Sequence, residues 1–514
     1  MRGAEALVRT LVDHGVDVCF ANPGTSEMHV VAALDTVGGL RGVLALAEGV
    51  ATGAADGYAR IADRPAAVLL HLGPGLGNGL ANLHNARRAG VPLLAVIGDH
   101  ATSHKRYDAP LESDIDAVAG TVAGWVRRTG RPRDIGADAA AAVAAAATGA
   151  VAALILPADV CWSDGAEPAG PAVAASPAHP DDAAVRTAAT ALRSGDPAVL
   201  LIGGDATREP GLSAAARIAA ATGAQLLCET FPARLQRGAG LPPVERLGYF
   251  AEAAAAQLAG VRRLVLAGAR SPVSFFAYPG RPSDLVPEGC DVHVLAARGA
   301  ATAALTALAD EVARGVAAPL APARRPALPT GPLTAAAIAD AVGALLPERA
   351  IVVDESNTAG LALPAATAGA PQHDWLTLTG GAIGYGLPAA VGAAIAAPDR
   401  PVLALQADGS AMYTLPALWT QARERLDVTT VLYDNRSYDI LRVELARVGA
   451  SGGERANALF DLGRPDLDFV RLAEGMGVPA RRAVTANEFV DALRAALAEP
   501  GPHLIDAVIP SMMG

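Results

Sequence analysis

The sequence has few aromatic residues and no long apolar run. Aromatic residues make up 4% of its 514 residues, although apolar residues make up 52%. Cores of this composition are expected to be helix-on-sheet layers of small aliphatic side chains, not clusters of aromatic rings. No stretch of about 18 uninterrupted apolar residues occurs, and this excludes a helix that crosses a membrane. The length predicts roughly three domains of about 100–200 residues each.

Cysteine and clustered positive charge are also scarce. The net charge is −11, and the basic pairs Arg127–Arg128 and Arg324–Arg325 are too short to form a nucleic-acid or anionic-membrane surface. The first residues begin an amphipathic helix and not a signal peptide, so we expect a cytoplasmic protein. The cysteines lack the spacing of a metal site and the density of a disulfide framework, so we expect them to be reduced and mostly buried. They are Cys19, Cys161, Cys228 and Cys290.

Helical and strand patterns alternate along the whole chain. In the first block, short apolar strands are predicted at residues 16–20, 43–46, 66–71 and 93–97. Repeated β-α-β units of this kind predict parallel sheets covered by helices on both faces. Two segments rich in proline and alanine read as linkers, at 163–180 and 317–332. The predicted fold class is therefore α/β, with three doubly wound parallel-sheet domains in series at 1–165, 180–316 and 333–514.

Polar and glycine residues follow the predicted strands of the third block. Asp408, Gly409 and Ser410 come directly after one buried strand, and Asn435 ends the next. The carboxyl ends of the strands are where open α/β sheets bind ligands. Mg²⁺ prefers oxygen ligands, so the Asp408 carboxylate, the Asn435 amide and the backbone carbonyl near Ser437 could hold this ion against a diphosphate. Each residue alone could equally be a helix cap or a turn residue.

The same residues carry a resemblance to a known family. The run Ala407-Asp408-Gly409-Ser410 followed by Asp434-Asn435-Arg436-Ser437 resembles the metal–diphosphate motif of thiamine-diphosphate enzymes. That motif usually begins Gly-Asp-Gly and ends Asn-Asn, so Ala407 and Asp434 depart from it, while both metal-ligand positions are present. The resemblance implies thiamine diphosphate and Mg²⁺ as cofactors, and it extends over nearly the whole chain.

Glu48 resembles the cofactor-activating glutamate of this family. It follows the apolar run Leu44-Ala45-Leu46-Ala47 and precedes a helix. The resemblance implies that its carboxyl group binds the far ring nitrogen of the aminopyrimidine and shifts the ring to its imino tautomer. A charge-assisted hydrogen bond of this kind contributes roughly 1.5–3 kcal/mol. Taken alone, a glutamate at the start of a helix is more often a surface residue that complements the helix dipole.

The segment Gly380–Pro388 resembles the loop that cradles the same cofactor. The resemblance implies that the Gly381 carbonyl accepts the aminopyrimidine proton and that Ile383 props the cofactor into a bent shape. It also implies that Glu355, Ser356 and Asn357 meet the diphosphate. In this family the catalytic glutamate and the metal site face one another across two subunits. The expected assembly is therefore a homodimer or a dimer of dimers.

A glycine-rich segment, Gly73-Pro74-Gly75-Leu76-Gly77-Asn78-Gly79, follows the strand at 66–71. It fails the Gly-x-Gly-x-x-Gly pattern of dinucleotide-binding turns, because the sixth position is Asn78 or Leu80 in the two possible registers. We expect a loop at the mouth of the thiamine site.

Two subfamilies compete within the resemblance. The runs at 22–25 (Asn-Pro-Gly-Thr) and 461–468 resemble acetolactate synthase large subunits, most closely the short actinobacterial paralogues. His71 instead matches an active-site histidine of benzoylformate decarboxylases and could act as a general acid near neutral pH. The second histidine of those decarboxylases is replaced by Phe275, and their substrate-binding serine by Thr25. Where the synthases carry a glutamine, this chain has Asp99-His100, which places His100 with Thr25 and Phe275 in the expected substrate pocket.

Three functions therefore remain open. The first is decarboxylation of a small 2-oxo acid with carboligation, as in acetolactate synthesis for branched-chain amino acids. The second is simple decarboxylation of a 2-oxo acid, and the third is a weakly active paralogue that associates with a true synthase subunit. FAD in the central domain is possible, since Gly203-Gly204-Asp205 and Gly268-Ala269-Arg270 follow strands, but it is not expected.

Overall fold

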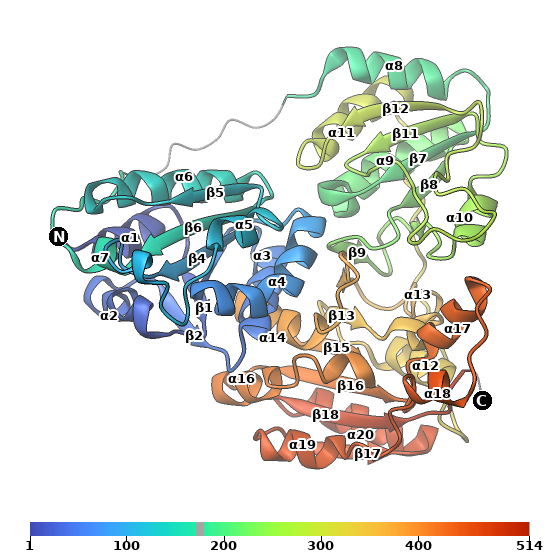
Figure 1. Ribbon diagram of the computed structural model, residues 1–514. Coiled ribbons are helices and arrows are strands. Elements are labelled where there is room, and N and C mark those ends of the chain that lie inside the picture. Colours follow the sequence, from blue (N-terminus) through green and yellow to red (C-terminus); the bar gives the residue numbers. More distant parts are fainter. Residues whose placement is uncertain (171–178, 513–514) are drawn as a thin grey trace.

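The chain folds into three α/β domains in series. The computed structural model describes residues 1–170 and 179–512. In Figure 1 the first domain is blue to teal, the central domain green and the third domain orange to red. The linker predicted at 163–180 includes residues 171–178, which lie outside the described residues, and its described ends form no helix. The segment from Arg314 to Leu333 likewise contains no helix.

The first domain is built on a six-stranded parallel sheet with the order β2-β1-β3-β4-β6-β5. Its strands are β1 (Val18–Ala21), β2 (Arg41–Leu44), β3 (Ala66–His71), β4 (Leu93–Asp99), β5 (Trp125–Arg128) and β6 (Val151–Pro157). Its helices are α1 (Gly3–Asp13), α2 (Met28–Val37), α3 (Glu48–Ala62), α4 (Leu72–Ala89), α5 (Ile115–Gly120), α6 (Ile135–Ala147) and α7 (Ala158–Trp162). The strand predicted at 43–46 thus ends at Leu44, and Glu48 is the first residue of α3.

The expected glycine-rich loop at 73–79 is wrong, because these residues form the first turns of α4. The glycines serve close packing and not a turn. A Cβ at Gly79 would lie 2.9 Å from the Thr52 methyl group on α3, and a Cβ at Gly73 would overlap the Ser113 side chain. Because Gly73 and Gly79 have no side chains, α4 can lie close against α3 and the segment before α5.

The central domain has a five-stranded parallel sheet with the order β10-β8-β7-β11-β12. Its strands are β7 (Ala198–Ile202), β8 (Gln225–Cys228), β10 (Glu245–Arg246), β11 (Arg263–Ala267) and β12 (Asp291–Ala296). Its helices are α8 (Asp182–Leu192), α9 (Glu209–Thr222), α10 (Ala251–Gln257) and α11 (Ala301–Val312).

The third domain has a seven-stranded sheet with the order β17-β18-β16-β15-β13-β14-β9. Its strands are β13 (Ile351–Glu355), β14 (His373–Thr377), β15 (Val402–Ala407), β16 (Val428–Asp434), β17 (Ala480–Ala483) and β18 (His503–Val508). Its helices are α12 (Ala335–Leu345), α13 (Leu363–Ala366), α14 (Gly386–Ala396), α15 (Asp408–Ala411), α16 (Ala417–Glu424), α17 (Asp439–Arg447), α18 (Glu454–Ala458), α19 (Phe469–Gly475) and α20 (Ala486–Ala498).

The sequence predicted a purely parallel third sheet, and this prediction is wrong at one edge. Its edge strand β9 (Leu235–Arg237) comes from the central segment of the chain and pairs antiparallel with β14. An edge position tolerates such a strand, because it needs hydrogen bonds on one side only. The central segment therefore reaches back into the third sheet and fastens the two domains together (Figure 1).

Small residues bring the first and third domains into close contact along α3 and α14. A Cβ at Gly57 on α3 would overlap the backbone of Ala389, and a Cβ at Gly392 on α14 would overlap the carbonyl of Ala54. Alanine and glycine thus replace larger side chains along the interface, as the composition predicted. The helix that begins with Glu48 is therefore packed directly on the helix that follows the 380–385 loop.

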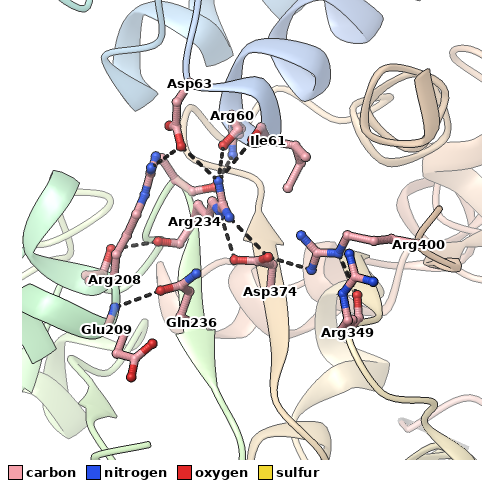
Figure 2. Close-up of polar contacts among 12 residues, drawn as sticks. Arg60, Ile61, Asp63, Arg208, Glu209, Arg234, Gln236, Arg349, Asp374 and Arg400 are labelled. Carbon is pink, nitrogen blue, oxygen red and sulfur yellow. Dashed lines mark hydrogen bonds and ion pairs between the residues drawn. The ribbon is translucent and has the colours of Figure 1, made fainter. Parts of the chain in front are cut away.

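A buried polar junction joins all three domains (Figure 2). Arg234, from the central segment, pairs with Asp374 on β14 at 2.6 Å and donates to the backbone carbonyl of Arg60 on α3 at 3.1 Å. Arg400 pairs with the same carboxylate at 2.6 Å. Burial alone would raise the pKa of Asp374, but Arg234 and Arg400 hold it below its usual value. The junction fixes the end of α3 relative to the third sheet.

The neighbouring His373 makes stability depend on pH. Burial lowers its pKa from 6.5 to about 4, so the folded state holds the ring neutral. Between pH 6.5 and 4 the unfolded state binds a proton on His373 that the folded state does not bind. The free energy of unfolding therefore falls as the pH drops through this range, by about 3 kcal/mol in total. In urea denaturation, His373→Gln should flatten the fall of the unfolding free energy between pH 6.5 and 4. An unchanged slope would show that His373 does not cause it.

The cysteine expectation is confirmed within the described residues. All four thiols are free, three of them are buried and Cys290 is partly exposed. Burial raises the pKa values of Cys19, Cys161 and Cys228 to about 12, so these thiols stay protonated. None of the described helices has the length and hydropathy that crossing a bilayer requires.

Candidate active site

A cavity lies at the carboxyl ends of β13, β15 and β16, which are neighbours in the third sheet. All residues predicted to hold the metal or the diphosphate line this cavity, except Glu355. They are Ser356, Asn357, Asp408, Gly409, Ser410, Asn435 and Ser437. The structure therefore brings together side chains that are as much as 81 residues apart in the printed numbering, from 356 to 437. The lining contains third-domain residues only.

Asp408 is held rigidly at the end of β15. Its carboxylate accepts hydrogen bonds from the backbone N–H groups of Gly409 and Arg436, each at 2.7 Å. The Tyr438 ring packs where a Cβ at Gly409 would lie. Burial raises the pKa of Asp408 to about 6, against the effect of these hydrogen bonds. A buried carboxylate without a basic partner is destabilised when ionised, and a cation bound in the cavity would relieve this cost.

Asn435 is oriented from both sides. Its amide oxygen accepts the Ser437 backbone N–H at 3.0 Å, and its amide nitrogen donates to the Asp439 carboxylate at 3.0 Å. On the opposite side of the cavity, Asn357 donates to the Ser410 hydroxyl at 2.9 Å. Asp408, Asn435 and Asp439 all supply oxygen atoms, the ligands preferred by hard divalent cations. Within the described residues, no three His, Cys, Asp or Glu side chains lie close enough together to hold a metal ion by themselves. A metal ion in this cavity would therefore also need ligands such as the Asn435 amide, a backbone carbonyl or a diphosphate.

Glu355 has a different position from the one expected. Its carboxylate is 1% exposed and accepts the backbone N–H groups of Gly384 at 2.7 Å and Gly386 at 2.6 Å. Burial raises the pKa of this carboxyl above its usual value. Glu355 therefore shapes the loop before α14 and does not line the cavity that would hold a diphosphate.

The loop that contains Gly381 and Ile383 is also held from the first domain. Asn85 on α4 donates to the Ala382 carbonyl at 2.8 Å, and Asn82 donates to the Gly384 carbonyl at 3.1 Å. Gly381 has a φ of +76°, which favours glycine at this position. Two buried asparagines thus hold in place a loop whose backbone conformation at Gly381 favours glycine.

Phe275 lies directly over this loop. A Cβ at Gly381 would come within 2.8 Å of the Phe275 ring. Phe275 belongs to a group of aromatic rings in the central domain that pack mostly edge to face, with centroid distances of 5.0–6.0 Å between neighbours: Phe231, Tyr249, Phe250, Phe275 and Phe276. Few aromatic residues occur in the chain, yet a quarter of its twenty lie here. The sequence position of Phe275 gave no indication of this group.

Glu48 and His71 meet at the first turns of α4. A Cβ at Gly75 would lie 3.4 Å from the Glu48 carboxylate and 3.3 Å from Cβ of His71. Asn78 donates to the Glu48 carboxylate at 3.2 Å. The two residues predicted to be catalytic are therefore neighbours on one face of the first domain, at the amino end of α3 and the carboxyl end of β3.

The expected substrate residues Thr25 and His100 lie at the same edge of the first sheet. Thr25 is exposed in the turn after β1, and His100 follows β4, the strand next to β3. The His100 ring packs against the His104 ring in a tilted arrangement, with a centroid distance of 5.2 Å. Thr25, His71 and His100 thus follow three neighbouring strands.

Sequence reasoning missed Glu27, which lies beside His71. Its carboxylate is 1% exposed and lies 2.9 Å from Nδ1 of His71, within hydrogen-bond distance. In the sequence this glutamate stands just before an apolar helical pattern, where it reads as an ordinary cap of α2. It accepts the Gly24 backbone N–H at 2.8 Å, the bond that the third residue of a capping box makes at the start of the short 3-10 helix Thr25–Glu27. Nothing in the sequence pattern indicates its second partner.

Comparison with known proteins decides the family. The model of the N-terminal TPP binding domain of thiamine pyrophosphate enzymes matches residues 1–119, and that of their C-terminal TPP binding domain matches residues 356–507. The chain belongs to the thiamine pyrophosphate enzyme family. The two matched regions contain the Glu48–His71 face and the Asp408 cavity, respectively.

Individual members of this family resemble the chain over its full length. It is 73% identical, over 100% of both chains, to "Putative acetolactate synthase large subunit IlvX" of Mycobacterium tuberculosis (strain ATCC 25618 / H37Rv). It is 31% identical to a benzoylformate decarboxylase of Pseudomonas aeruginosa over 96% of both chains. The structure of the thiamine diphosphate-dependent 4-hydroxybenzoylformate decarboxylase of Rhodococcus jostii RHA1 superposes with a TM-score of 0.86 at 24% identity, over 99% of both chains, and so shares the fold. The chain is thus a thiamine-diphosphate enzyme with synthase and decarboxylase relatives.

Proposed function

We propose that the protein decarboxylates a small 2-oxo acid with thiamine diphosphate and Mg²⁺ and joins the product to a second carbonyl compound, as acetolactate synthases do. The observation that carries the proposal is the pairing of Asp408 and Asn435 in one cavity, each fixed by backbone hydrogen bonds. This donor set fits Mg²⁺ bound to a diphosphate. The synthase relative at 73% identity favours carboligation.

Each group of residues has a separate task. Asp408, Asn435 and the Ser437 carbonyl hold the metal ion, and Ser356, Asn357 and Ser410 orient the diphosphate. Gly381 and Ile383 fix the aminopyrimidine, and Glu48 holds a proton at its ring nitrogen. Bound thiamine diphosphate supplies the carbon nucleophile and accepts the electron pair that carbon dioxide leaves behind. His71 then holds or moves a proton on the reacting substrate.

Simple decarboxylation is the second candidate, and His71 is the observation that favours it. A histidine beside Glu48 could protonate the product carbon before a second carbonyl compound reacts. The test is turnover of pyruvate alone with acetolactate and acetaldehyde both quantified. Acetolactate as the main product supports carboligation, whereas acetaldehyde alone supports the decarboxylase. No turnover of any 2-oxo acid by the cofactor-loaded protein supports the third candidate, a weakly active subunit.

The proposed assembly is a homodimer, or a dimer of two such dimers, with sites shared between chains. The cavity is lined by third-domain residues only, while Glu48 and His71 belong to the first domain. Mixing inactive Glu48→Gln protein with inactive Asp408→Ala protein should restore part of the activity, because each mixed dimer contains one intact site. At random exchange, mixed dimers would form about half of the population. Absence of recovery after subunit exchange has been verified by mass spectrometry would contradict the shared site.

FAD is not part of the proposal. The carboxylate of Asp205 accepts the backbone N–H groups of Gly299 at 2.7 Å and Thr302 at 2.8 Å, at the amino end of α11. Free N–H groups at such a helix end are what a dinucleotide phosphate would need. Nearby, Arg298 after β12 and Glu229 after β8 pair at 3.5 Å. At this end of the central sheet, the Gly299 and Thr302 N–H groups are therefore already hydrogen-bonded to Asp205.

A further inference from the structure

We propose that Glu27 is a positioning residue that fixes His71 with Nδ1 protonated and leaves Nε2 free to exchange a proton with the substrate. The inference rests on the proposed 2-oxo acid decarboxylation for its chemical meaning, but the pair itself is a property of the fold. It assigns a task to a buried carboxylate that neither the cofactor cavity nor Glu48 uses.

The contacts of Glu27 define which nitrogen of His71 carries the proton. Oε2 of Glu27 lies 2.9 Å from Nδ1 of His71 and 2.8 Å from the Gly24 backbone nitrogen. The Ser26 hydroxyl donates to Oε1 of the same carboxylate. An ionised carboxylate can only accept hydrogen bonds, so Nδ1 is the donor. Since a neutral imidazole has one N–H, Nε2 is then the basic nitrogen of the ring.

The surrounding chain is shaped to fit this pair. A Cβ at Gly24 would overlap the imidazole ring of His71, and a Cβ at Gly98 would overlap the carboxylate of Glu27. Apolar side chains of Val30, Leu69, Val96 and Leu156 line the small space around Glu27. Among the described residues, His71 is the one basic side chain that pairs with Glu27. Two glycines, from different segments of the chain, thus make room for a carboxylate and an imidazole to meet.

Burial makes this carboxylate an effective positioning group. Glu27 is 1% exposed, whereas the His71 side chain is 23% exposed and so still reaches solvent or substrate. In a dry environment a charge-assisted hydrogen bond is short and directional. If the ring turned over, Glu27 would lose its basic partner and keep only the Gly24 N–H and the Ser26 hydroxyl, so a buried charge would be less well compensated. Because Nδ1 is bound to Glu27, Nε2 is the ring nitrogen left for a substrate.

The proton transfer balances with these groups alone. His71 protonated on both nitrogens gives the Nε2 proton to the substrate-derived carbon, where a carbon–hydrogen bond forms with the electron pair left by carbon dioxide. The ring becomes neutral with its Nδ1 proton still donated to Glu27. Water then returns a proton to Nε2. Glu27 stays ionised throughout and touches no reacting atom.

The first test is spectroscopic and does not need activity. In wild-type protein labelled with ¹⁵N-histidine, the Nδ1 proton of His71 should give a downfield signal that is absent from His71→Gln. Glu27→Gln should abolish or strongly shift this signal, while Glu27→Asp should retain it. Glu229→Gln, a change to a partly buried carboxylate of the central domain paired with Arg298, is the control and should leave it unchanged. A His71 signal unaltered by Glu27→Gln would overturn the proposal.

The second test is kinetic. Glu27→Gln should lower kcat by about 10²- to 10⁴-fold, the usual contribution of a general acid or base, with a much smaller change in KM. Added to His71→Ala, it should cause no further loss beyond about twofold, because both changes remove one function. Glu27→Asp should recover part of the rate. Full multiplication of the two losses would overturn the proposal. If wild-type protein turns over no 2-oxo acid, the proposed function fails, and the spectroscopic test still decides the role of Glu27.

Discussion

Replacing Asp408 by alanine is expected to abolish binding of both Mg²⁺ and thiamine diphosphate. Asp408 is the one carboxylate predicted to bind the metal directly, and two backbone N–H groups hold it in place. Loss of a residue that merely supports a metal ligand typically costs about 10- to 100-fold in affinity. Loss of a direct ligand should cost at least about 10²-fold, and the diphosphate should be lost with the metal, because the ion would help to hold it on the protein.

Calorimetric titration of the purified protein with thiamine diphosphate, with and without Mg²⁺, measures this effect. Asp399→Ala is a matched control: it removes a fully exposed carboxylate of the same domain that pairs with Arg349. The control should bind both ligands as the wild type does. Unchanged affinity in Asp408→Ala would show that the cavity at the end of β15 is not the metal site.

Glu48→Gln is expected to slow hydrogen–deuterium exchange at the reactive thiazolium carbon by about 10²- to 10⁴-fold in the absence of substrate. The glutamine amide keeps the size of the side chain but cannot supply the proton that shifts the aminopyrimidine tautomer. His71→Ala should leave this exchange nearly unchanged and instead slow turnover or alter the ratio of ligated to released product. Glu48 and His71 are thus expected to act at different steps, Glu48 before substrate binds and His71 after it.

Acid quench followed by NMR measures the exchange in both variants. Normal exchange in Glu48→Gln would remove the activating role of Glu48. Impaired exchange in His71→Ala would mean that His71 shapes the cofactor pocket and does not handle substrate.

The strand ends of the third domain show why much of the fold was predictable. Apolar strands were predicted just before Asp408 and ending at Asn435, and the structure has β15 and β16 there, so the polar residues that follow them had to lie at one edge of a parallel sheet. Asp408 and Asn435 could therefore be placed together from sequence alone, as the cavity confirms. The family resemblance added the cofactor, which the spacing by itself does not specify.

Side-chain direction and long-range contacts were beyond the reach of the sequence. Glu355 ends β13 with its side chain inward, and this orientation decides that it holds the 384–386 backbone and not a diphosphate. Glu27 looks like a helix cap in the sequence. Its pairing with His71 arises only when β1 and β3 lie side by side in the sheet, and the local sequence does not show this. The glycines at 73–79 suggest a loop until the packing of α4 against α3 explains them. The edge strand β9 is too short to be recognised by any periodicity.

The central claim is that decarboxylation of a 2-oxo acid requires thiamine diphosphate and Mg²⁺ bound by this chain. Release of carbon dioxide tests it most directly. Protein stripped of metal and cofactor by chelation should release none from pyruvate or benzoylformate. Adding thiamine diphosphate and Mg²⁺ together should restore release from at least one of them, while either addition alone should not. Release by the stripped protein, or none from either acid after both additions, would contradict the claim.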